Sequence, residues 1–201
     1  MTTLALELSS AVGSIAWCGA SPNEQFQTRF ANDRKHSGAF FENLEACLKR
    51  FGRPNRIVVG LGPGSYAGTR IAIATATGLA AATAAELLGA PSLRAIETDA
   101  EDYVLIGDAR RHSFFFARVS GRRCLEGPVL LTEEELRGRL REATCPILTS
   151  EPLAAFPEVE VRYPSALILA GVEIDVRAAI GTPLEPIYLR APHITFPKTV
   201  G

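Results

Sequence analysis

The first part of the chain is a series of short apolar runs, and their spacing predicts three strands. Residues 4–8 and 12–18 are mostly apolar, a short polar link separates them, and residues 24–30 alternate between apolar and polar side chains. Runs of this kind, bounded by turn residues, are typical of strands. Strands that follow one another through short turns are antiparallel, so we do not expect an all-parallel sheet.

A helical pattern follows between Ser37 and Phe51. Steps of three and four residues separate its apolar side chains, which places them on one helical face: Phe40, Leu44, Cys47, Leu48 and Phe51. We assign Ser37 as the N-cap and Gly52 as the C-cap of this helix. The apolar run 56–60 that comes next is typical of a buried central strand.

A second, longer helix is predicted from Thr69 to Leu87, with Gly89-Ala90-Pro91 ending it. Its side chains are apolar or small on every side, so it lacks the single wet face of an ordinary surface helix. We expect the sheet to cover one side of this helix. The other side is covered either by the second half of the chain or by a partner.

The strand pattern restarts at Tyr103, and the second half has an order of elements similar to the first. It predicts strands at 103–108 and 113–119, a charged helix at 133–142, a strand at 146–148 and a helix at 165–180. The sequence therefore predicts an α/β fold of two lobes built on a related plan. Residues 1–100 form the first lobe and residues 101–201 a smaller second lobe, whose final residues are free to pack back on the first.

The composition is that of a globular protein without an overall electric field. The chain has 201 residues, 47% of them apolar, and its 21 basic and 22 acidic side chains give a formal net charge of −1. Nucleic acids and anionic membranes are therefore not attracted to the chain as a whole, and any contact with RNA is expected to be local or indirect. The basic pairs at 34–35, 110–111 and 122–123 are interpreted as solvated turn residues.

The cysteines and the N-terminus favour a cytoplasmic protein. The four cysteines form no Cys-x-x-Cys pair, which is typical of reduced, packed thiols. The first residues lack the basic and apolar regions of a secretory signal. No membrane span is expected, because the weakly charged segment 71–88 consists mostly of small residues.

The most informative motif is a glycine-rich loop, residues 62–68, between a predicted strand and the long helix. It matches Gly-x-Gly-x-x-Gly/Ala, but a dinucleotide fingerprint belongs to the first strand of a sheet and needs an acid ending the next strand, whereas Glu86 is expected to be helical. A P-loop is excluded because no lysine follows the glycines. We interpret the glycines as allowing a tight turn and close helix packing, with a weak anion site at the helix N-terminus.

No catalytic, cofactor-binding or metal-ligating set can be assembled from the sequence. Ser65 does not fit a nucleophile elbow, since that motif needs glycine at positions 63 and 67. His36, His112 and His193 are too scattered for a metal motif. We therefore expect no metal and no cofactor.

Several motifs together resemble the TsaB family of tRNA threonylcarbamoyladenosine biosynthesis proteins. They are Leu4–Ser10, His36-Ser37, the loop with Gly62, Pro63, Gly64, Ser65, Gly68 and Arg70, the turn Asp108-Ala109-Arg110-Arg111, and Tyr188-Leu189-Arg190. The loop and the Asp-Ala-Arg turn are the specific parts, and the resemblance spans nearly the whole chain. It implies an actin-like, ribonuclease-H-like fold with mixed sheets, of the hexokinase, actin and heat-shock chaperone superfamily.

The same resemblance implies a function in tRNA modification. Members of the TsaB family are non-catalytic partners of the related transferase TsaD, which works with the ATPase TsaE and modifies the adenosine beside the anticodon. By this resemblance the chain is a cytoplasmic pseudoenzyme that meets tRNA only indirectly. In the catalytic paralogue a metal-binding histidine pair occupies the places held here by Ser92 and Ile96, which cannot ligate a metal.

The alternative is a stand-alone actin-fold ATPase or small-molecule kinase. Such an enzyme needs an acidic residue in the first hairpin, for which Glu7 is the candidate, and a Gly-Gly turn for adenosine. The segment Ala170-Gly171-Val172 offers a single glycine, which favours the non-catalytic interpretation.

The outer faces of the two helices are the candidate partner surface. Small residues on the long helix would let another helix come close, and the first helix would add its outward side. The residues assigned to this interface are Phe41, Glu45, Ala72, Thr75, Ala76, Leu79 and Thr83. The resemblance implies that this surface serves either a homodimer or the heterodimer with TsaD.

Overall fold

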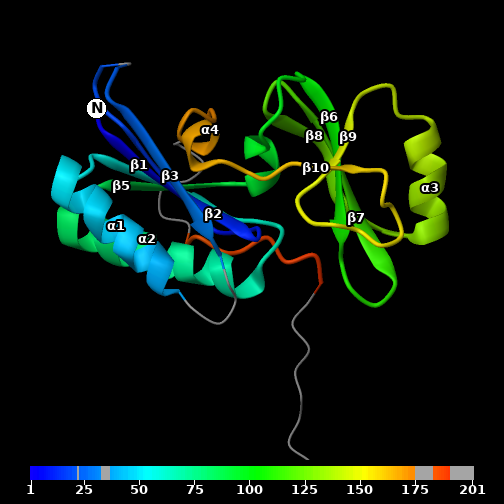
Figure 1. The fold of residues 1–201 in the computed structure, drawn as a ribbon, viewed down its shortest axis with the longest axis horizontal. Coiled ribbons are helices and arrows are strands. Elements are labelled where there is room, and N and C mark those ends of the chain that lie inside the picture. Colours follow the sequence, from blue (N-terminus) through cyan, green and yellow to red (C-terminus); the bar gives the residue numbers. More distant parts are fainter. Residues whose placement is uncertain (22, 33–36, 175–182, 191–201) are drawn as a thin grey trace, which may run out of the picture.

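The computed structural model describes residues 1–21, 23–32, 37–174 and 183–190. It contains two five-stranded sheets that lie side by side, each with helices on its faces (Figure 1). The first sheet has the strand order β3-β2-β1-β4-β5 and the second has the order β10-β9-β6-β7-β8.

The first sheet contains the strands predicted from the apolar runs and one more. Its strands are β1 (Thr3–Glu7), β2 (Val12–Cys18), β3 (Gln25–Ala31), β4 (Arg56–Gly60) and β5 (Glu86–Ala90). β1 pairs antiparallel with β2, and β2 pairs antiparallel with β3. β4 runs parallel to β1, and β5 runs parallel to β4. The sheet is therefore mixed, as the hairpin pattern predicted.

Helices cover both faces of the first sheet, because successive strand residues point to opposite sides. Leu4 and Leu6 pack in one apolar cluster beneath α1 (Gly38–Phe51) and α2 (Tyr66–Thr83). Ala5 lies on the other face, in a cluster with the short helix α4 (Ala166–Ala170). The helical face predicted for α1 is confirmed, since Phe40, Leu44 and Cys47 are buried.

The second sheet repeats the plan of the first. Its strands are β6 (Asp102–Asp108), β7 (Ser113–Ser120), β8 (Arg123–Thr132), β9 (Ile147–Thr149) and β10 (Glu160–Val161). As in the first sheet, three consecutive strands pair antiparallel, and two later strands add in parallel on the far side of the first of them. Helix α3 (Glu133–Arg141) precedes β9 as α1 precedes β4.

The prediction for the second helix was wrong at both ends. α2 begins at Tyr66 and ends at Thr83, where Ala84 adopts a left-handed conformation with φ 55°. The apolar run that follows forms β5, because its backbone completes a parallel ladder with β4. Residues 84 and 85 are alanines, so no glycine or proline marks the end of the helix.

Two features of the second half also differ from the predictions. β8 was not anticipated, because a Gly-Pro pair interrupts its apolar pattern. The predicted helix over 165–180 is helical only at Ala166–Ala170 and is not helical at 171–174, while its remainder falls outside the described residues. The helix ends where Gly171 caps it with backbone hydrogen bonds to Ile168 and Leu169.

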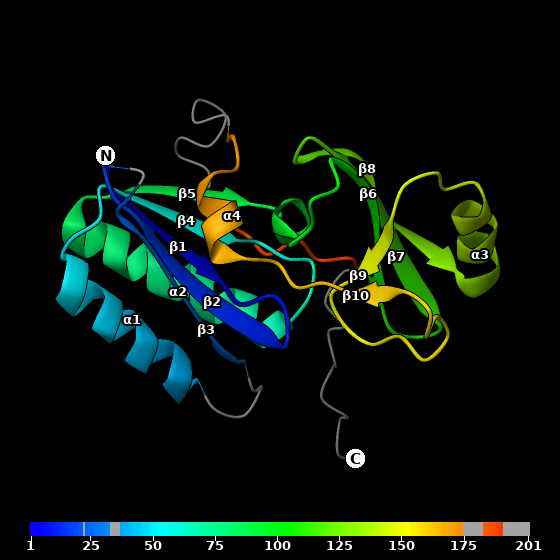
Figure 2. The same ribbon diagram turned by 45° about the horizontal axis from the view of Figure 1, so that its top comes forward.

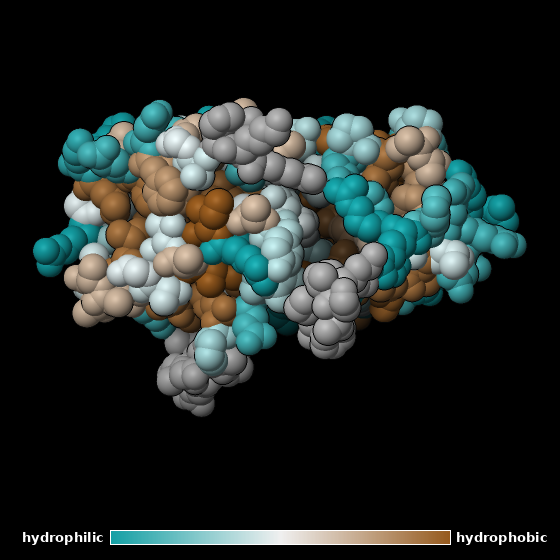
Figure 3. All heavy atoms as spheres, turned by 90° about the horizontal axis from the view of Figure 1, so that it is seen from below, coloured by the Kyte–Doolittle hydropathy of each residue, from teal (hydrophilic) through white to brown (hydrophobic). Residues whose placement is uncertain are grey.

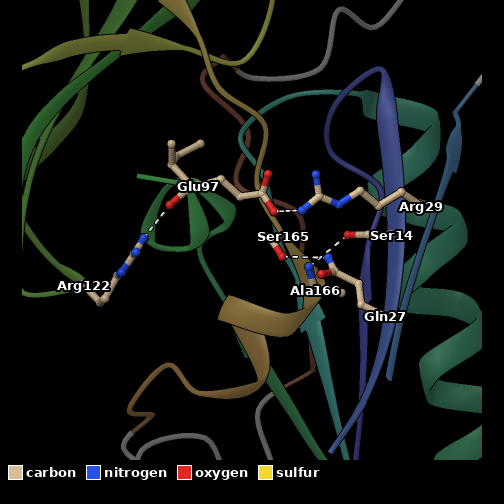
Figure 4. A network of polar contacts seen from close by, with 8 residues as sticks. Ser14, Gln27, Arg29, Glu97, Arg122, Ser165 and Ala166 are labelled. Carbon is tan, nitrogen blue, oxygen red and sulfur yellow. Dashed lines mark hydrogen bonds and ion pairs between the residues drawn. The ribbon is translucent and has the colours of Figure 1, made fainter. Parts of the chain in front are cut away.

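Polar contacts join the two lobes where the chain crosses between the sheets (Figure 4). The two crossing segments bond to each other, with Ser165 N 2.9 Å from Ala95 O and Glu97 N 3.0 Å from Tyr163 O. Glu97 also forms an ion pair with Arg29 of β3, and Ser165 Oγ accepts a 2.8 Å hydrogen bond from Gln27 Nε2. α4 thus lies on the first sheet although it belongs to the second half of the sequence.

Arg122 takes part in these contacts, although the basic pair at 122–123 was interpreted as solvated. Its guanidinium donates hydrogen bonds to Ile96 O and Thr98 O. Within the described residues, no helix is long and apolar enough to cross a membrane. The division of the chain into domains at residue 100 stays a prediction.

Candidate functional site: the cleft between the lobes

Four of the five motifs picked out in the sequence meet at one cleft between the lobes, with a cavity volume of about 520 Å³. The glycine-rich loop and the turn after β1 contribute its first wall. The end of β6 and residues 150–151 contribute the second, and the segment 186–189 closes it from a third side. The polar residues that line the cleft are Ser9, Ser10, Asn32, Ser65, Thr69, Asp108, Arg110, Ser150, Glu151 and Tyr188.

The glycine-rich loop packs directly on the turn after β1. Ser65 N donates a 2.6 Å hydrogen bond to Ser9 O, and Ser65 Oγ caps α2 by accepting a 3.2 Å bond from Gly68 N. A Cβ atom at Gly64 would lie 2.1 Å from Ser9 O, and one at Gly68 would lie 2.1 Å from Leu8 O. Any side chain at these positions would collide with backbone. The glycines therefore serve close packing, as the sequence interpretation held.

Half of the six amides of this loop have acceptors in the described part of the protein. Gly62 N donates to Ser92 Oγ at 3.0 Å, and Ser65 N and Gly68 N are bonded as described above. The amides of Gly64, Tyr66 and Ala67 have no acceptor among the described residues. Two of these three open α2, so the weak anion site predicted at the start of this helix stays a prediction.

Glu86 occupies a different place from the one predicted. It begins β5 and forms a 2.6 Å ion pair with Arg56, which begins the neighbouring strand β4. The glycine-rich loop leaves the opposite end of β4. A dinucleotide site needs its acidic residue at the same sheet edge as the loop. Glu86 therefore cannot serve such a site, because it lies at the opposite edge and not because it is helical.

Glu7, the candidate acid of the first hairpin, lies beneath the cleft and does not line it. Its side chain is completely buried, and Oε1 accepts a 2.7 Å hydrogen bond from Ser9 N. Oε2 has no hydrogen-bond partner among the described residues, although Ser92 Oγ lies nearby. Burial raises the pKa of this carboxyl, and the neighbouring hydroxyls of Ser9 and Ser92 oppose the rise in part.

The turn Asp108-Ala109-Arg110-Arg111 forms the tip of the β6–β7 hairpin. The Asp108 carboxylate accepts a 2.7 Å hydrogen bond from Arg110 N and pairs with the Arg110 guanidinium at 3.1 Å. Arg110, Arg111 and His112 have φ values of 65°, 54° and 57°. Left-handed backbone is rare for residues other than glycine, so this hairpin holds three strained residues in a row.

The segment 183–190, which we call the strap, passes between the two lobes (Figure 2). Leu184 packs against the core of the first lobe, and Leu189 packs against the core of the second. Ile187 N donates a 2.8 Å hydrogen bond to Leu61 O, while Arg190 Nη2 donates a 2.7 Å bond to Ser113 Oγ. The strap connects both cores to the cleft. In the sequence, the motif Tyr188-Leu189-Arg190 was the only sign that this segment matters.

Two tyrosines and an arginine stack at the mouth of the cleft. The guanidinium carbon of Arg70 lies 3.9 Å from the ring centroid of Tyr66, and Arg70 Nε donates a 2.9 Å hydrogen bond to the Tyr188 hydroxyl. The two tyrosine rings are 5.8 Å apart. Both rings face solvent, with 55% of Tyr66 and 39% of Tyr188 exposed.

The predicted partner surface is only partly supported by the structure. Phe41 is 47% exposed, Glu45 is exposed and pairs with Lys49, and apolar side chains are visible on the side of the first lobe that carries α1 and α2 (Figure 3). Ala72 and Ala76, in contrast, are completely buried against the chain's own sheet. They were assigned to the outer face wrongly, because an all-apolar helix gives no signal for which side faces inward.

The outer face of α2 is open in the described part of the chain. Its exposed residues are small apart from a tyrosine and an arginine near its start: Tyr66, Ala67, Arg70, Ala74, Thr77, Gly78, Ala81 and Ala82. Thr75, Leu79 and Thr83 are half-buried at its border. The described residues of the second lobe leave this face exposed, which favours a partner as its cover.

The structure describes one of the three histidines and both paralogue positions. His36 and His193 lie outside the described residues, and His112 is exposed at the hairpin tip. Ser92 and Ile96 are both buried. Among the described residues, no three His, Cys, Asp or Glu side chains gather closely enough to hold a metal ion.

Comparison with solved structures gives the class of the fold. An uncharacterized protein with similarity to peptidase YEAZ from Pseudomonas aeruginosa superposes with a TM-score of 0.76 at 21% identity, covering 94% of this chain and 99% of the other. A structure of YeaZ from Pseudomonas aeruginosa gives a TM-score of 0.71 at 22% identity with the same coverage. The protein is therefore a two-lobed α/β protein of the actin-like type.

Sequence comparison identifies the family. The model of TsaD, the tRNA N6-adenosine threonylcarbamoyltransferase, matches residues 30–130, and the chain belongs to this family. The match to YeaZ supports the assignment to its TsaB branch, as the motifs indicated.

Curated relatives are similar over about two thirds of the chain. The uncharacterized protein Rv3421c of Mycobacterium tuberculosis is 32% identical over 138 residues, and the uncharacterized protein ML0378 of Mycobacterium leprae is 29% identical over 137 residues. Each match covers 68% of this chain. The chain spans 64% and 38% of the length of these two relatives, respectively.

Proposed function

We propose that the protein is a TsaB-type subunit that supports threonylcarbamoylation of tRNA by a TsaD-type transferase and a TsaE-type ATPase in the cytoplasm. Membership of the TsaD family supports the assignment of this reaction, because the matching family model describes a tRNA N6-adenosine threonylcarbamoyltransferase. The subunit does not itself transfer the group. It stabilises the active arrangement of its catalytic relative.

The observation that carries the non-catalytic role is the chemistry at Ser92 and Ile96. By resemblance, the catalytic paralogue places its metal-binding histidines at these two positions. Here Ser92 is a buried hydrogen-bond acceptor for the glycine-rich loop, and Ile96 is an apolar residue packed in the core of the second lobe. A buried hydroxyl and an alkyl side chain cannot replace two imidazole ligands.

The partner surface in this proposal consists of the outward side of α1 and the border of α2. A shallow hollow lies over Phe41, Leu44, Glu45 and Leu48. Beside it, the small exposed residues of α2 let a second helix approach closely. The TsaD-type subunit, which shares the fold, would pair its own two helices with these, and a second copy of the chain would use the same surface when that subunit is absent.

The deciding experiment is reconstitution. The cognate TsaD-type and TsaE-type proteins are incubated with tRNA, ATP and threonylcarbamoyl-adenylate, with and without this chain, and the modified nucleoside is measured by mass spectrometry. The proposal requires that modification depend on the chain. Equal modification in its absence would show that it is not a subunit of the transferase.

The second candidate is an ATPase or kinase acting alone, which the open cleft between two actin-like lobes favours. Against it stands the burial of Glu7 beneath the cleft. Calorimetric titration of the isolated protein with ATP and Mg²⁺ separates the two. Saturable binding that is lost in Glu7→Gln would favour the enzyme.

A further inference from the structure

The mouth of the cleft gathers positive and aromatic side chains from three separate segments. Arg70 and Tyr66 come from the start of α2, Arg110 from the β6–β7 hairpin, and Tyr188 and Arg190 from the strap. Tyr66, Arg110 and Tyr188 all line the cleft. The strap also links this group directly, because Arg190 Nη2 lies 3.5 Å from Arg110 O. These residues, which we call the cleft-mouth cluster, form one continuous surface.

The local charge at this surface is opposite to that of the whole chain. Arg70, Arg110 and Arg190 bring three positive charges, and the adjacent Arg111 brings a fourth. The two acids that line the cleft, Asp108 and Glu151, are partly engaged by the hairpin, since Asp108 pairs with Arg110 and Glu151 Oε1 accepts a 3.2 Å bond from Asp108 N. A chain with a net charge of −1 therefore presents a positive rim at this place.

The hairpin that carries Arg110 is held in an unfavourable backbone conformation. Each non-glycine residue in the left-handed region costs on the order of 1 kcal/mol, and three of them follow one another here. The Asp108 carboxylate and the Arg190 side chain fix the tip from both sides. Strain retained at an exposed, cationic tip beside a cleft is typical of ligand-contacting positions.

We propose that the cleft-mouth cluster binds an unpaired stretch of the substrate tRNA, with a base stacked on Tyr66 and phosphates held by the hairpin arginines and Arg190. Single-stranded RNA is recognised by stacking of its splayed bases on aromatic rings and guanidinium planes. Exposed tyrosines that already stack with an arginine provide such a platform. The choice of RNA as the ligand rests on the function proposed above, and it replaces the indirect contact that the family resemblance implied.

The chemistry favours RNA over a protein partner at this surface. Exposed apolar side chains that would form the centre of a protein interface are absent from the cluster as described, where the exposed carbon belongs to tyrosine rings. The proposed protein interface uses α1 and the outer face of α2. Tyr66 and Arg70 also belong to the exposed face of α2, so the two surfaces meet at the first turn of this helix.

The test is binding of a fluorescently labelled anticodon stem-loop RNA, measured by anisotropy with the reconstituted complex and with the full chain alone. Tyr66→Ala should weaken binding about tenfold, as expected for one lost base stack. Tyr66→Phe keeps the ring and should bind as the wild type does. Tyr66 is the residue of choice because its exposed ring does not belong to either core.

A second variant tests the charges. Arg110→Asn with Arg111→Asn removes two cations, and asparagine tolerates positive φ, so the hairpin is retained. The slope of log affinity against log salt should become less steep by about 1.4, which is about 0.7 for each cation removed from a single-stranded contact. The matched control is Arg53→Asn with Arg141→Asn. These two exposed arginines lie beyond the end of α1 and at the end of α3, away from the cleft.

The outcomes are distinguishable. Tenfold weaker binding by Tyr66→Ala together with the reduced salt slope, and wild-type behaviour of the control, support the proposal. Absence of RNA binding by the wild-type complex, or equal binding by all variants, overturns it. Loss of the TsaD-type subunit from the variants in a pull-down also overturns it, because the surface would then be a protein interface. If tRNA is modified without the chain but Tyr66-dependent RNA binding persists, only the function proposed above fails.

Discussion

At the scale of single residues, Glu7 is the most unusual side chain of the first lobe. It is completely buried, one of its oxygens lacks a partner among the described residues, and Gly60 leaves the space that this oxygen occupies. A Cβ at Gly60 would lie 1.9 Å from Oε2. The protein therefore accommodates a carboxyl where an apolar group would have been simpler to bury, and burial favours its neutral form.

The unfolding free energy of the protein should depend on pH through the Glu7 carboxyl. Because the pKa of Glu7 is raised in the folded state above its ordinary value of 4.5, the neutral folded form stabilises the protein fully below pH 4.5. Relative to Glu7→Gln, the wild type should lose stability as the pH rises from 4.5 to the folded pKa, by about 1.4 kcal/mol for each unit of elevation. Urea unfolding at a series of pH values measures this difference. A difference that does not change with pH would mean that Glu7 titrates normally.

Two glycines of α2 offer a matched pair of substitutions. A Cβ at Gly68 would lie 2.1 Å from a backbone oxygen, whereas a Cβ at Gly78 meets nothing within 4 Å in the described part of the chain. Gly68→Ala should destabilise the protein by about 1–3 kcal/mol through overpacking. Gly78→Ala should stabilise it by about 0.5–1 kcal/mol, because alanine favours an exposed helix interior. Thermal and urea unfolding of both variants test this, and equal effects would contradict the packing argument.

At the scale of elements, α1 and α2 have different exposure and should respond differently to a charge. Phe41→Asp changes an exposed side chain of α1, so it should leave the fold intact and weaken binding to the TsaD-type subunit about tenfold or more. Leu79 packs against the core of the first lobe, so Leu79→Asp should also unfold the protein. Circular dichroism and a pull-down separate the two effects. Undiminished binding of folded Phe41→Asp would remove α1 from the interface.

At the scale of the whole molecule, the lobes are joined by the crossing segments and by the strap. Glu97 of one crossing segment pairs with Arg29 of the first lobe, and Arg122 of the second lobe donates to Ile96 O of the same segment. The strap packs on the first core through Leu184 and on the second through Leu189. A structure with shared contacts of this kind should unfold as one unit. The division at residue 100 therefore describes the order of the elements more than independent stability.

Trp17 makes this expectation measurable. It is the only tryptophan, it is buried in the first lobe, and it stacks on Phe51 at a centroid distance of 5.3 Å. The fluorescence transition of Trp17 should coincide with the far-ultraviolet circular dichroism transition of the whole chain. Arg122→Ala, which leaves two backbone carbonyls without this donor, should lower the unfolding free energy by about 1–3 kcal/mol. Two separate midpoints in the wild type would show that the lobes unfold independently.

The sequence by itself determined the local elements whose patterns are unambiguous. Alternation identified β3, and short apolar runs identified β1, β2, β4, β6 and β7. Helical spacing identified the buried face of α1, because burial of one helical face requires that period. The motifs of the loop and the Asp-Ala-Arg turn also led to the correct family and fold. These conclusions depend on residues that are close together in the chain.

Only the tertiary structure decided what depends on residues far apart. Pairing with β4 turned the end of a predicted helix into β5, and packing on the sheet decided which side of α2 is buried, since an all-apolar pattern fits either side. The meeting of Arg70, Arg110 and Tyr188 at one cleft mouth likewise follows from the strap crossing between the lobes. The hydropathy of a residue indicates whether it can be buried. Which other residues bury it depends on the whole fold.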